Sequence, residues 1–379
     1  MKIFFPMETV PGETRVSATP DSVKKFVQLG AEVTVEKGAG EGSSIADAEF
    51  TEAGATMVDA AQGYGDATMV VRLHPPLEGE LDSLKAGQTL LSFLYPLGNK
   101  EIVDALQKAK LTSIAMDQVP RISRAQSMDA LSSQANLAGY KAVINAAEHL
   151  PKIFPLLMTA AGAIKPARVV ILGAGVAGLQ AVATAKRLGA IVQVSDIRPA
   201  VKEQVESLGG KFIEVETSAD AEDAGGYAKE ASEDFKKKQE EALRACLKEA
   251  DVVICTALIP GRPAPRLLTT DMVQLMRAGG VIVDLAAERG GNCELTKPGE
   301  VVTAHGITIV GKMFTPAQVP VHASQMYARN IFNLVKPMIV EGELTFDFED
   351  EIIQGSVITK DGELVHEATK NSLNGGSNG

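Results

Sequence analysis

The sequence is poor in the residues on which several classes of protein depend. Its 379 residues include no tryptophan and three cysteines, and only 4% of them are aromatic. Cys246, Cys255 and Cys293 form no CxxC motif, which excludes a disulfide framework and a four-thiolate metal site. The core must therefore be built from aliphatic residues and methionine.

Positive charge is also scarce. Lysine and arginine number 37 against 48 aspartates and glutamates, so the formal net charge is −11. Proteins that bind nucleic acid or anionic lipid present a basic face to the phosphates. We therefore expect no nucleic-acid partner and no direct insertion into a membrane.

Long apolar runs are absent. The longest one, from Val169 to Ala185, contains three glycines and is shorter than the roughly 20 residues that a membrane span needs. The N-terminal apolar run, residues 2–5, soon meets charge and predicts a first strand rather than a signal peptide. These features favour a cytoplasmic protein in a reducing compartment.

Two sets of short apolar runs alternate with helical patterns. Such alternation is typical of crossover units and parallel sheets, and the length suits two domains of roughly 100–200 residues. The fold class predicted is α/β, with two doubly wound, Rossmann-like parallel sheets. The expected strands are 2–5, 32–35, 68–73, 89–94 and 111–116 in the first set, and 168–173, 191–196, 211–215, 251–257, 280–286 and 308–312 in the second.

The order of the remaining patterns suggests a discontinuous first domain. Helical patterns cover 125–150 and 322–339, and a hairpin with an Asp-Gly turn is expected over 352–365. Because the first set lacks a closing helix, we expect the C-terminal helix to return to it. The domains expected are 1–135 plus 320–379, and 136–319, with a cleft between them.

A glycine motif opens the second set. Gly173, Gly175 and Gly178 form GxGxxG directly after an expected strand and at the start of an expected helix. In a dinucleotide site the first glycine permits the tight turn, the second admits the pyrophosphate, and the third lets helix and strand pack closely. The helix N-terminus then offers free N–H groups to the phosphates. The alternative is that these glycines serve packing alone.

An acidic residue follows at the expected distance. Asp196 ends the next strand, about 20 residues on, where a carboxylate accepts hydrogen bonds from the ribose hydroxyls and repels a 2′-phosphate. This favours NAD(H) over NADP(H). Arg198 complicates the choice, because an arginine there accommodates that phosphate. Ile197 and Arg198 complete the cofactor-binding residues expected at this strand end.

The segment 120–132 is the second concentration of polar residues. Arg121 and Arg124 are candidates for contacts with phosphates, and the spacing of Gln126, Asp129 and Ser132 places them on one side of a helical or turn-like backbone. The alternative interpretation is a helix cap flanked by solvated polar side chains.

Several long runs carry a resemblance to a known family. They are PRISRAQSMDALSSQANLAGYKAVI, TAAGAIKPARVVILGAGVAGLQAVATAKRLGA, KEQVESLGGKF, AGGYAKE, TALIPGRPAP and DLAAERGGNCELT. Together they resemble the NAD(H)-binding component, domain I or the alpha-1 subunit, of proton-translocating NAD(P) transhydrogenase. The resemblance extends over nearly the whole chain, and the architecture is shared with alanine dehydrogenase.

The resemblance implies roles for individual residues. Arg121 would meet the pyrophosphate, Asp129 and Ser132 would hold the carboxamide, and Gln126 would lie near the nicotinamide ribose, at the junction of two nucleotides. Tyr227 matches the tyrosine of a mobile loop that closes over the nucleotide. The residues that match the lining of the nucleotide cleft are Val176, Gly226, Gln239 and Leu258.

The resemblance also implies the reaction and the partners. Hydride passes directly between two nicotinamide rings held within roughly 3–3.5 Å, so this module needs orientation and the exclusion of water rather than a metal, acid or base. The chain has one dinucleotide motif, so NADP(H) must lie on a partner subunit. A homodimer is expected, together with a membrane-spanning, proton-translocating subunit that holds the chain at the inner face of a bacterial inner membrane.

Two other functions remain open. In alanine dehydrogenases a lysine holds the substrate and a histidine exchanges protons, whereas the matching positions here carry Arg72 and Tyr95. Tyrosine has an ordinary pKa near 10 and is a poor proton exchanger at neutral pH. His74 is a candidate substitute base but is expected to be a surface or loop histidine, and Arg15 is common to both families. A non-catalytic NAD(H)-binding module is the second alternative.

Overall fold

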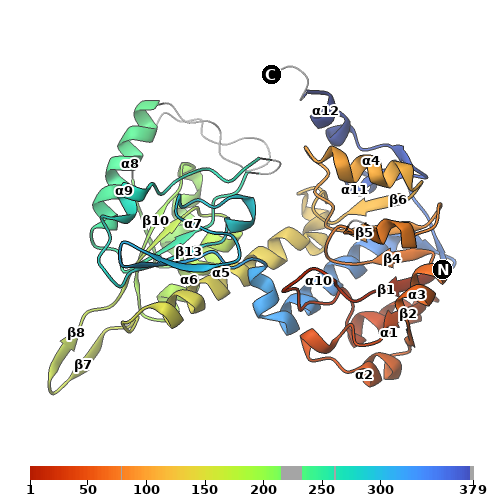
Figure 1. Cartoon of the computed structure of the whole chain (residues 1–379), viewed down its shortest axis with the longest axis horizontal. Helices are drawn as coiled ribbons and strands as arrows, with labels where there is room; N and C mark the ends of the chain where they lie inside the picture. The colour runs from red at the N-terminus through yellow and green to blue at the C-terminus, as the bar shows by residue number, and fades with distance from the viewer. Residues whose placement is uncertain (78, 215–232, 260–261, 376–379) are drawn as a thin grey trace. The chain divides into compact units, whose positions relative to one another are not determined.

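The computed structural model describes residues 1–77, 79–214, 233–259 and 262–375. The chain forms two compact units (Figure 1). Unit 1 contains residues 1–134 and 317–379, and unit 2 contains residues 135–316. Within the described residues, no helix combines the length and apolarity that crossing a bilayer requires.

Unit 1 is built on an eight-stranded sheet. Neighbouring strands from β6 to β3 are parallel, whereas β18 and β19 are antiparallel to the strands beside them. In sheet order the strands are β19 (Glu363–Leu364), β18 (Val357–Lys360), β6 (Thr112–Ala115), β5 (Thr89–Ser92), β4 (Met69–Val71), β1 (Lys2–Phe5), β2 (Glu32–Glu36) and β3 (Thr56–Val58).

The central strands are apolar on both faces because both faces are covered. Ile3 and Phe5 of β1 belong to one buried cluster, while Phe4 between them belongs to another, as expected when successive side chains alternate across a sheet. The covering helices are α1 (Pro20–Gln28), α2 (Asp47–Glu52), α3 (Ala60–Asp66), α4 (Lys100–Lys108), α10 (Pro320–Val335), α11 (Glu351–Ser356) and α12 (Glu367–Gly375).

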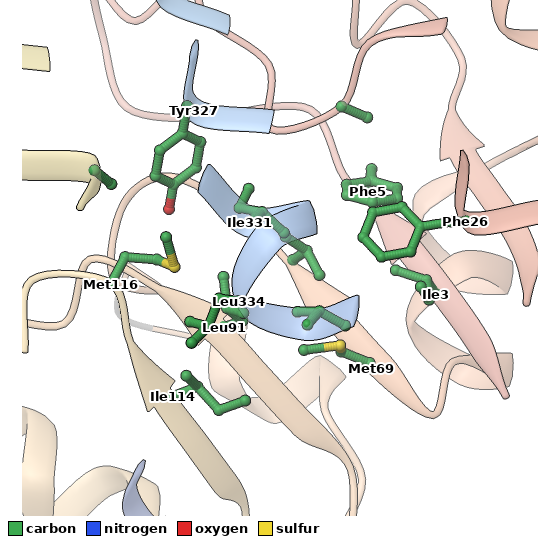
Figure 2. Close-up of a cluster of buried hydrophobic side chains, with 14 of the residues drawn as sticks. Ile3, Phe5, Phe26, Met69, Leu91, Ile114, Met116, Tyr327, Ile331 and Leu334 are labelled. Carbon is green, nitrogen blue, oxygen red and sulfur yellow. The ribbon is translucent and has the colours of Figure 1, made fainter. Parts of the chain in front are cut away.

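Helix α10, from the part of the chain that follows unit 2, completes the core of unit 1. Tyr327, Ile331 and Leu334 are fully buried and pack among side chains of β1 and β5, such as Ile3 and Leu91 (Figure 2). Residues from both ends of the chain thus share one apolar cluster. The buried Tyr327 hydroxyl donates to the Arg72 carbonyl at 2.9 Å, so no polar atom of that ring is left without a partner.

Unit 2 is built on a seven-stranded sheet, parallel except for β14. Its strands in sheet order are β11 (Lys211–Phe212), β10 (Ile191–Ser195), β9 (Arg168–Leu172), β12 (Val252–Cys255), β13 (Val281–Asp284), β15 (Ile307–Val310) and β14 (Val301–Ala304). The helices of this unit are α6 (Val176–Arg187), α7 (Lys202–Ser207), α8 (Glu233–Leu247) and α9 (Thr270–Val273). Helix α5 (Ala130–His149) starts in unit 1 and continues in unit 2.

The fold class predicted from the sequence is confirmed, with two Rossmann-like parallel sheets. Two local predictions were wrong. The helix expected over 125–150 is interrupted, because residues up to Met128 form the 3₁₀ helix η3 (Ser123–Met128) and Asp129 is extended before α5. The hairpin expected over 352–365 is shorter, because residues 352–356 belong to α11 and only β18 and β19 pair as a hairpin.

Residues 157–164 form a hairpin that the sequence analysis did not predict. Strands β7 (Leu157–Thr159) and β8 (Gly162–Ile164) pair antiparallel, and their side chains are exposed. Met158 is 75% exposed. A two-stranded ribbon has too few neighbours to bury its own apolar side chains.

Candidate functional site

The structure brings four of the five polar residues singled out in segment 120–132 to one pocket of unit 1. The pocket has a volume of about 260 Å³ and is formed by the loop before η3, by η3 itself and by the start of α5. Its lining residues are Pro120, Arg121, Ile122, Ala125, Gln126, Asp129 and Ser132. Arg121 and Gln126 have exposed side chains, whereas Ala125 is buried and anchors η3 to the core.

Asp129 and Ser132 act as one structural group. The Asp129 carboxylate accepts from the Ser132 backbone N–H at 2.8 Å and from its hydroxyl at 2.6 Å. Because Asp129 directly precedes α5, this is the arrangement of an N-cap, and a negative charge is favourable at a helix N-terminus. The helix cap considered as an alternative is thus present, in side chains that also line the pocket.

Arg124 was a candidate for a phosphate contact, but in the structure its guanidinium is already paired with a carboxylate. Its guanidinium donates to both oxygens of Asp350, at 2.8 and 2.7 Å. Hydrogen bonding from Arg124 lowers the pKa of the Asp350 carboxyl. Arg124 therefore belongs to a bidentate ion pair with the N-terminus of α11, a partner too distant in sequence to be foreseen.

In unit 2 the glycine motif lies at the carboxyl end of β9. Gly173 has φ +101°, a conformation that favours glycine. A Cβ atom at Gly178 would lie 1.9 Å from the Gly173 carbonyl oxygen, so only glycine allows α6 to approach the strand this closely. Among the described residues, no atom lies within 4 Å of a Cβ added at Gly175, the N-cap of α6.

The start of α6 suits an anion. The N-cap residue Gly175 has no side chain that could cap α6, and the first turn contains no acidic residue. The first N–H groups of a helix have no partner within the helix, and its dipole places partial positive charge there. The open space at Gly175 and the uncapped helix start therefore fit the pyrophosphate of a dinucleotide.

Asp196 lies beside this turn, at the end of β10, with both carboxylate oxygens engaged. One oxygen accepts from the Arg198 backbone N–H at 2.9 Å and from its Nε at 3.0 Å. The other accepts from the Ala174 N–H at 2.7 Å and from the Arg198 guanidinium at 2.9 Å. A carboxylate has about four acceptor positions, so a ribose hydroxyl must compete with Arg198 for Asp196.

The other residues expected to bind the cofactor lie at the same edge of unit 2. Val176 opens α6, Ile197 follows Asp196, and Leu258 follows β12 with its side chain 45% exposed. The Gln239 amide of α8 donates to the Ser195 hydroxyl at 3.4 Å, next to Asp196. Gly226 and Tyr227 lie outside the described residues.

Two residues at this edge were missed by the sequence analysis. The Thr256 hydroxyl lies within 3.1 Å of the Leu172 and Gly173 carbonyl oxygens, so it ties the end of β12 to the glycine turn. The Asn292 amide contacts both the N–H and the C=O of Ala257. Both residues lie in runs that carry the family resemblance, but neither was singled out, because only the strand pairing brings them to the site.

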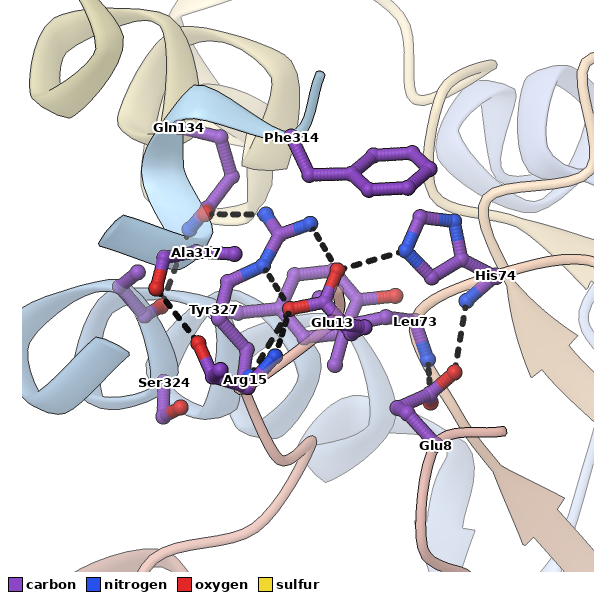
Figure 3. A network of polar contacts seen from close by, with 12 residues as sticks. Glu8, Glu13, Arg15, Leu73, His74, Gln134, Phe314, Ala317, Ser324 and Tyr327 are labelled. Atoms are coloured by element: carbon purple, nitrogen blue, oxygen red, sulfur yellow. Dashed lines mark hydrogen bonds and ion pairs between the residues drawn. The ribbon is translucent and has the colours of Figure 1, made fainter. Parts of the chain in front are cut away.

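Unit 1 also contains a buried polar network (Figure 3). Arg15 donates through two nitrogens to the two oxygens of Glu13, and through a third nitrogen to Gln134. His74 contacts the same Glu13 carboxylate at 2.6 Å, so it is a loop histidine held in a network rather than a freely solvated one. Although burial opposes it, hydrogen bonds from Arg15 and His74 lower the pKa of Glu13 to about 2.

Arg72 belongs to the same region and is almost completely buried. It pairs with Glu80 at 2.8 Å and lies 3.7 Å from Glu8. Burial raises the pKa of Glu8, although the charge of Arg72 opposes the shift. These groups follow β1 and β4, the two strands at which the sheet order of unit 1 reverses. Among the described residues, no cluster of His, Cys, Asp and Glu is arranged to hold a metal ion.

Comparison with known protein families agrees with this architecture. Residues 4–138 match the family described as alanine dehydrogenase/PNT, N-terminal domain, and residues 142–367 match alanine dehydrogenase/PNT, C-terminal domain. The chain belongs to the alanine dehydrogenase/PNT family. The resemblance noted in the sequence is thereby confirmed.

Within the alanine dehydrogenase/PNT family, the chain is similar to transhydrogenase subunits over nearly its whole length. It is 52% identical to an NAD(P) transhydrogenase alpha-subunit polypeptide of Rhodospirillum rubrum, over 97% of this chain and 98% of the relative. It is 45% identical to NAD(P) transhydrogenase subunit alpha of Cereibacter sphaeroides, over 96% of this chain and 71% of the relative. Identity to the alanine dehydrogenase of Mycolicibacterium smegmatis is 30%, over 98% and 97%.

Solved structures of the family have the same fold. A crystal structure of transhydrogenase from Sinorhizobium meliloti has a TM-score of 0.88 at 43% identity, covering 96% of this chain and all of that chain. An L-alanine dehydrogenase structure has a TM-score of 0.81 at 27% identity, covering 99% of both chains.

Proposed function

We propose that this chain is the NAD(H)-binding subunit of a proton-translocating NAD(P) transhydrogenase. The observation that carries the proposal is 52% identity to an NAD(P) transhydrogenase alpha subunit along 97% of the chain. The glycine turn in unit 2 supports it, because its geometry fits a pyrophosphate.

The two units contribute different groups. In unit 2, Gly175 and the start of α6 bind the pyrophosphate, and Asp196 selects NAD(H) by accepting from the ribose hydroxyls. In unit 1, Arg121 contacts the pyrophosphate, Asp129 and Ser132 hold the carboxamide, and Gln126 orients the nicotinamide ribose. Bound NADH supplies the hydride, and NADP(H) lies on a partner subunit. The residues of this chain bind, orient and exclude water, so the chain is active only with its partners.

Reconstitution tests this function. The chain is mixed with an NADP(H)-binding transhydrogenase subunit, and transfer from NADH to an NADP analogue is followed by stopped flow. We expect rapid transfer that requires both proteins. If both nucleotides bind and no transfer occurs, the chain is an NAD(H)-binding module without this enzymatic role.

Variants of the pocket in unit 1 separate binding from transfer. Arg121→Gln removes a positive charge and should weaken NADH binding. Gln126→Asn shortens a side chain without changing charge and should slow transfer with little change in NADH affinity. Equal transfer rates of the Gln126 variant and the parent at saturating nucleotide would contradict the role given to Gln126.

A homodimer is part of the proposal. The β7–β8 hairpin exposes Leu157, Met158 and Ile164, and apolar patches of this kind mark interaction sites. The partner we propose is a second copy of the chain. A two-fold interface uses the same surface of each copy, so a symmetric dimer would bury the apolar side chains of both hairpins.

Sedimentation tests the dimer. Met158→Asp places a charge on the hairpin and should shift the chain from dimer to monomer in analytical ultracentrifugation. Val340→Asp is a matched control, because Val340 is 51% exposed on the separate short hairpin β16 (Ile339–Val340) and β17 (Glu343–Leu344). A Met158 variant that remains dimeric would exclude this surface.

The cellular setting follows from the proposed partners. A membrane-spanning, proton-translocating subunit holds the chain at the inner face of a bacterial inner membrane, on the cytoplasmic side. Fractionation with and without that subunit tests this proposal, since the chain should leave the membrane fraction when the subunit is removed.

A further inference from the structure

The segment that lines the pocket of unit 1 is held from behind by helix α10. The side-chain amide of Asn330 donates to the Ser127 carbonyl at 2.9 Å, and the Asn333 amide donates to the same oxygen at 3.1 Å. Ser127 lies between Gln126 and Asp129, which line the pocket. The carbonyl in the middle of this segment is therefore fixed by residues about two hundred positions later in the chain.

The Ser127 carbonyl fixes the orientation of the Asn330 amide, because a carbonyl oxygen only accepts and therefore requires the amide nitrogen. The amide oxygen then faces the Ser133 hydroxyl at 2.7 Å. Asn330 is 5% exposed and Ser133 is 9% exposed. Asn330 thus links η3 to the first turn of α5, the two elements that carry the pocket residues. A buried amide satisfied at both ends is rigid, and its loss leaves a carbonyl with one fewer donor.

The other end of the segment is fixed by α11. Arg124 and Asp350 form the bidentate ion pair described above. A Cβ at Gly355 of α11 would lie 3.1 Å from the Pro120 ring, so this helix packs closely on the residue that begins the pocket. The C-terminal part of unit 1 therefore supports segment 120–129 at both ends.

We infer that Asn330 is a positioning residue for hydride transfer, acting through the Ser127 carbonyl on Gln126 and Asp129. This inference rests on the proposed function of the pocket. Asn330 is absent from the pocket lining, and its effect should appear in the transfer rate rather than in the affinity for NADH. Misplacement of reacting groups by as little as 1 Å lowers rates by up to about 100-fold.

The first experiment compares transfer in reconstituted holoenzyme. Asn330→Ala and the isosteric Asn330→Asp both remove the donor to Ser127, and each should slow transfer about tenfold or more while NADH affinity stays within about threefold. Gln325→Ala is the matched control, because Gln325 is an exposed amide on the same helix, and this variant should transfer at the parental rate. A parental rate in both Asn330 variants would overturn the inference.

A double-mutant cycle separates positioning from loss of stability. If Asn330 acts through Gln126, the double variant with Gln126→Asn should be little slower than the slower single variant. Additive losses would show that Asn330 does not act through Gln126. Ser133→Thr, which retains the hydroxyl, should keep a faster rate than Ser133→Ala.

A measurement on the chain alone separates failure of this inference from failure of the proposed function. Hydrogen exchange of residues 121–129 should be about fivefold faster in Asn330→Ala, because one buried hydrogen bond is lost. If the parental chain transfers no hydride, the proposed function fails whatever the exchange shows. If the parent transfers hydride and exchange in 121–129 is unchanged in the variant, the positioning role fails.

Discussion

At the scale of single residues, Asp196 combines two tasks at the edge of unit 2. It accepts the Ala174 N–H of the glycine turn and also binds Arg198. The carboxylate therefore shapes the turn, and in the proposed function it also provides the charge that discriminates between nucleotides. Because Arg198 occupies acceptor positions of Asp196, a ribose hydroxyl in that proposal must displace it from some of them.

The substitution Asp196→Asn tests this discrimination. The amide oxygen keeps an acceptor for Ala174, but the charge is lost. Hydrogen bonds to a charged group are worth about 1.5–3 kcal/mol, so NADH affinity should fall about tenfold or more while NADPH affinity does not fall. The ratio of the two dissociation constants, from titration, is the measurement. Arg198→Gln is the control and should retain the preference for NADH.

Glu13 makes the stability of unit 1 depend on pH, with lower stability in acid. Its folded-state pKa is about 2, against 4.5 for an unperturbed glutamate, so it stabilises the fold above about pH 4.5 and loses this effect as pH falls towards 2. Breaking a buried pair costs about 3–5 kcal/mol. Glu13→Gln should therefore lower the free energy of unfolding by about 3 kcal/mol at pH 7. In urea titrations the difference from the parent should shrink at pH 3.5, and a constant difference would contradict the assignment.

At the scale of elements, the turn from β9 to α6 uses two glycines for different physical reasons. Gly178 is required by the close approach of helix and strand, since an added Cβ would meet the Gly173 carbonyl oxygen at 1.9 Å. Gly175 has ordinary extended angles, φ −77° and ψ −169°, and open space where a Cβ would stand. The fold alone would tolerate alanine at Gly175.

Alanine at each position separates folding from binding. Gly175→Ala should leave thermal unfolding unchanged and weaken NADH binding strongly, because the methyl group occupies the path of the pyrophosphate. Gly178→Ala should lower stability by about 1–3 kcal/mol, the usual effect of overpacking. Differential scanning calorimetry and NADH titration are compared for both. A Gly175 variant that binds NADH normally would remove this turn from the nucleotide site.

Sequence analysis predicted the elements whose signal lies in one contiguous stretch of residues. Runs such as 168–173 and 251–257 are apolar because both faces of β9 and β12 are covered, and the glycine motif is contiguous. Elements such as the β7–β8 hairpin were missed because an exposed ribbon has no alternation between a buried and a solvated face. The start of the 125–150 helix was placed wrongly because Asp129 caps α5 within an otherwise helical pattern.

The pocket residues of unit 1 were also accessible to sequence analysis, through their spacing and their resemblance to a family. The residues that hold the pocket segment in place could not be predicted from the sequence. Asn330 and Asp350 are separated from segment 120–129 by about two hundred residues, and no periodicity connects them. The same holds for Glu13 and His74, which meet only because β1 and β4 are neighbours in the sheet.

At the scale of the whole molecule, the fold is shared with alanine dehydrogenases and the chemistry of unit 1 is the discriminating feature. Arg72 is buried in ion pairs with Glu80 and Glu8, and Tyr95 stacks on Phe93. Neither group is suited to exchange protons near neutral pH. We expect no oxidation of NADH when pyruvate and ammonia are added to the chain. Turnover in that spectrophotometric assay would support the dehydrogenase alternative.

Unit 1 is formed by both ends of the chain, and this affects how it folds during synthesis on the ribosome. Residues 135–316 form a compact unit from one continuous stretch, and can fold as soon as they have left the exit tunnel. The sheet of unit 1 must wait for α10 with Tyr327, Ile331 and Leu334, which emerges only after all of unit 2. During that interval its apolar face is uncovered, so the nascent N-terminal segment is exposed to non-native association until α10 arrives.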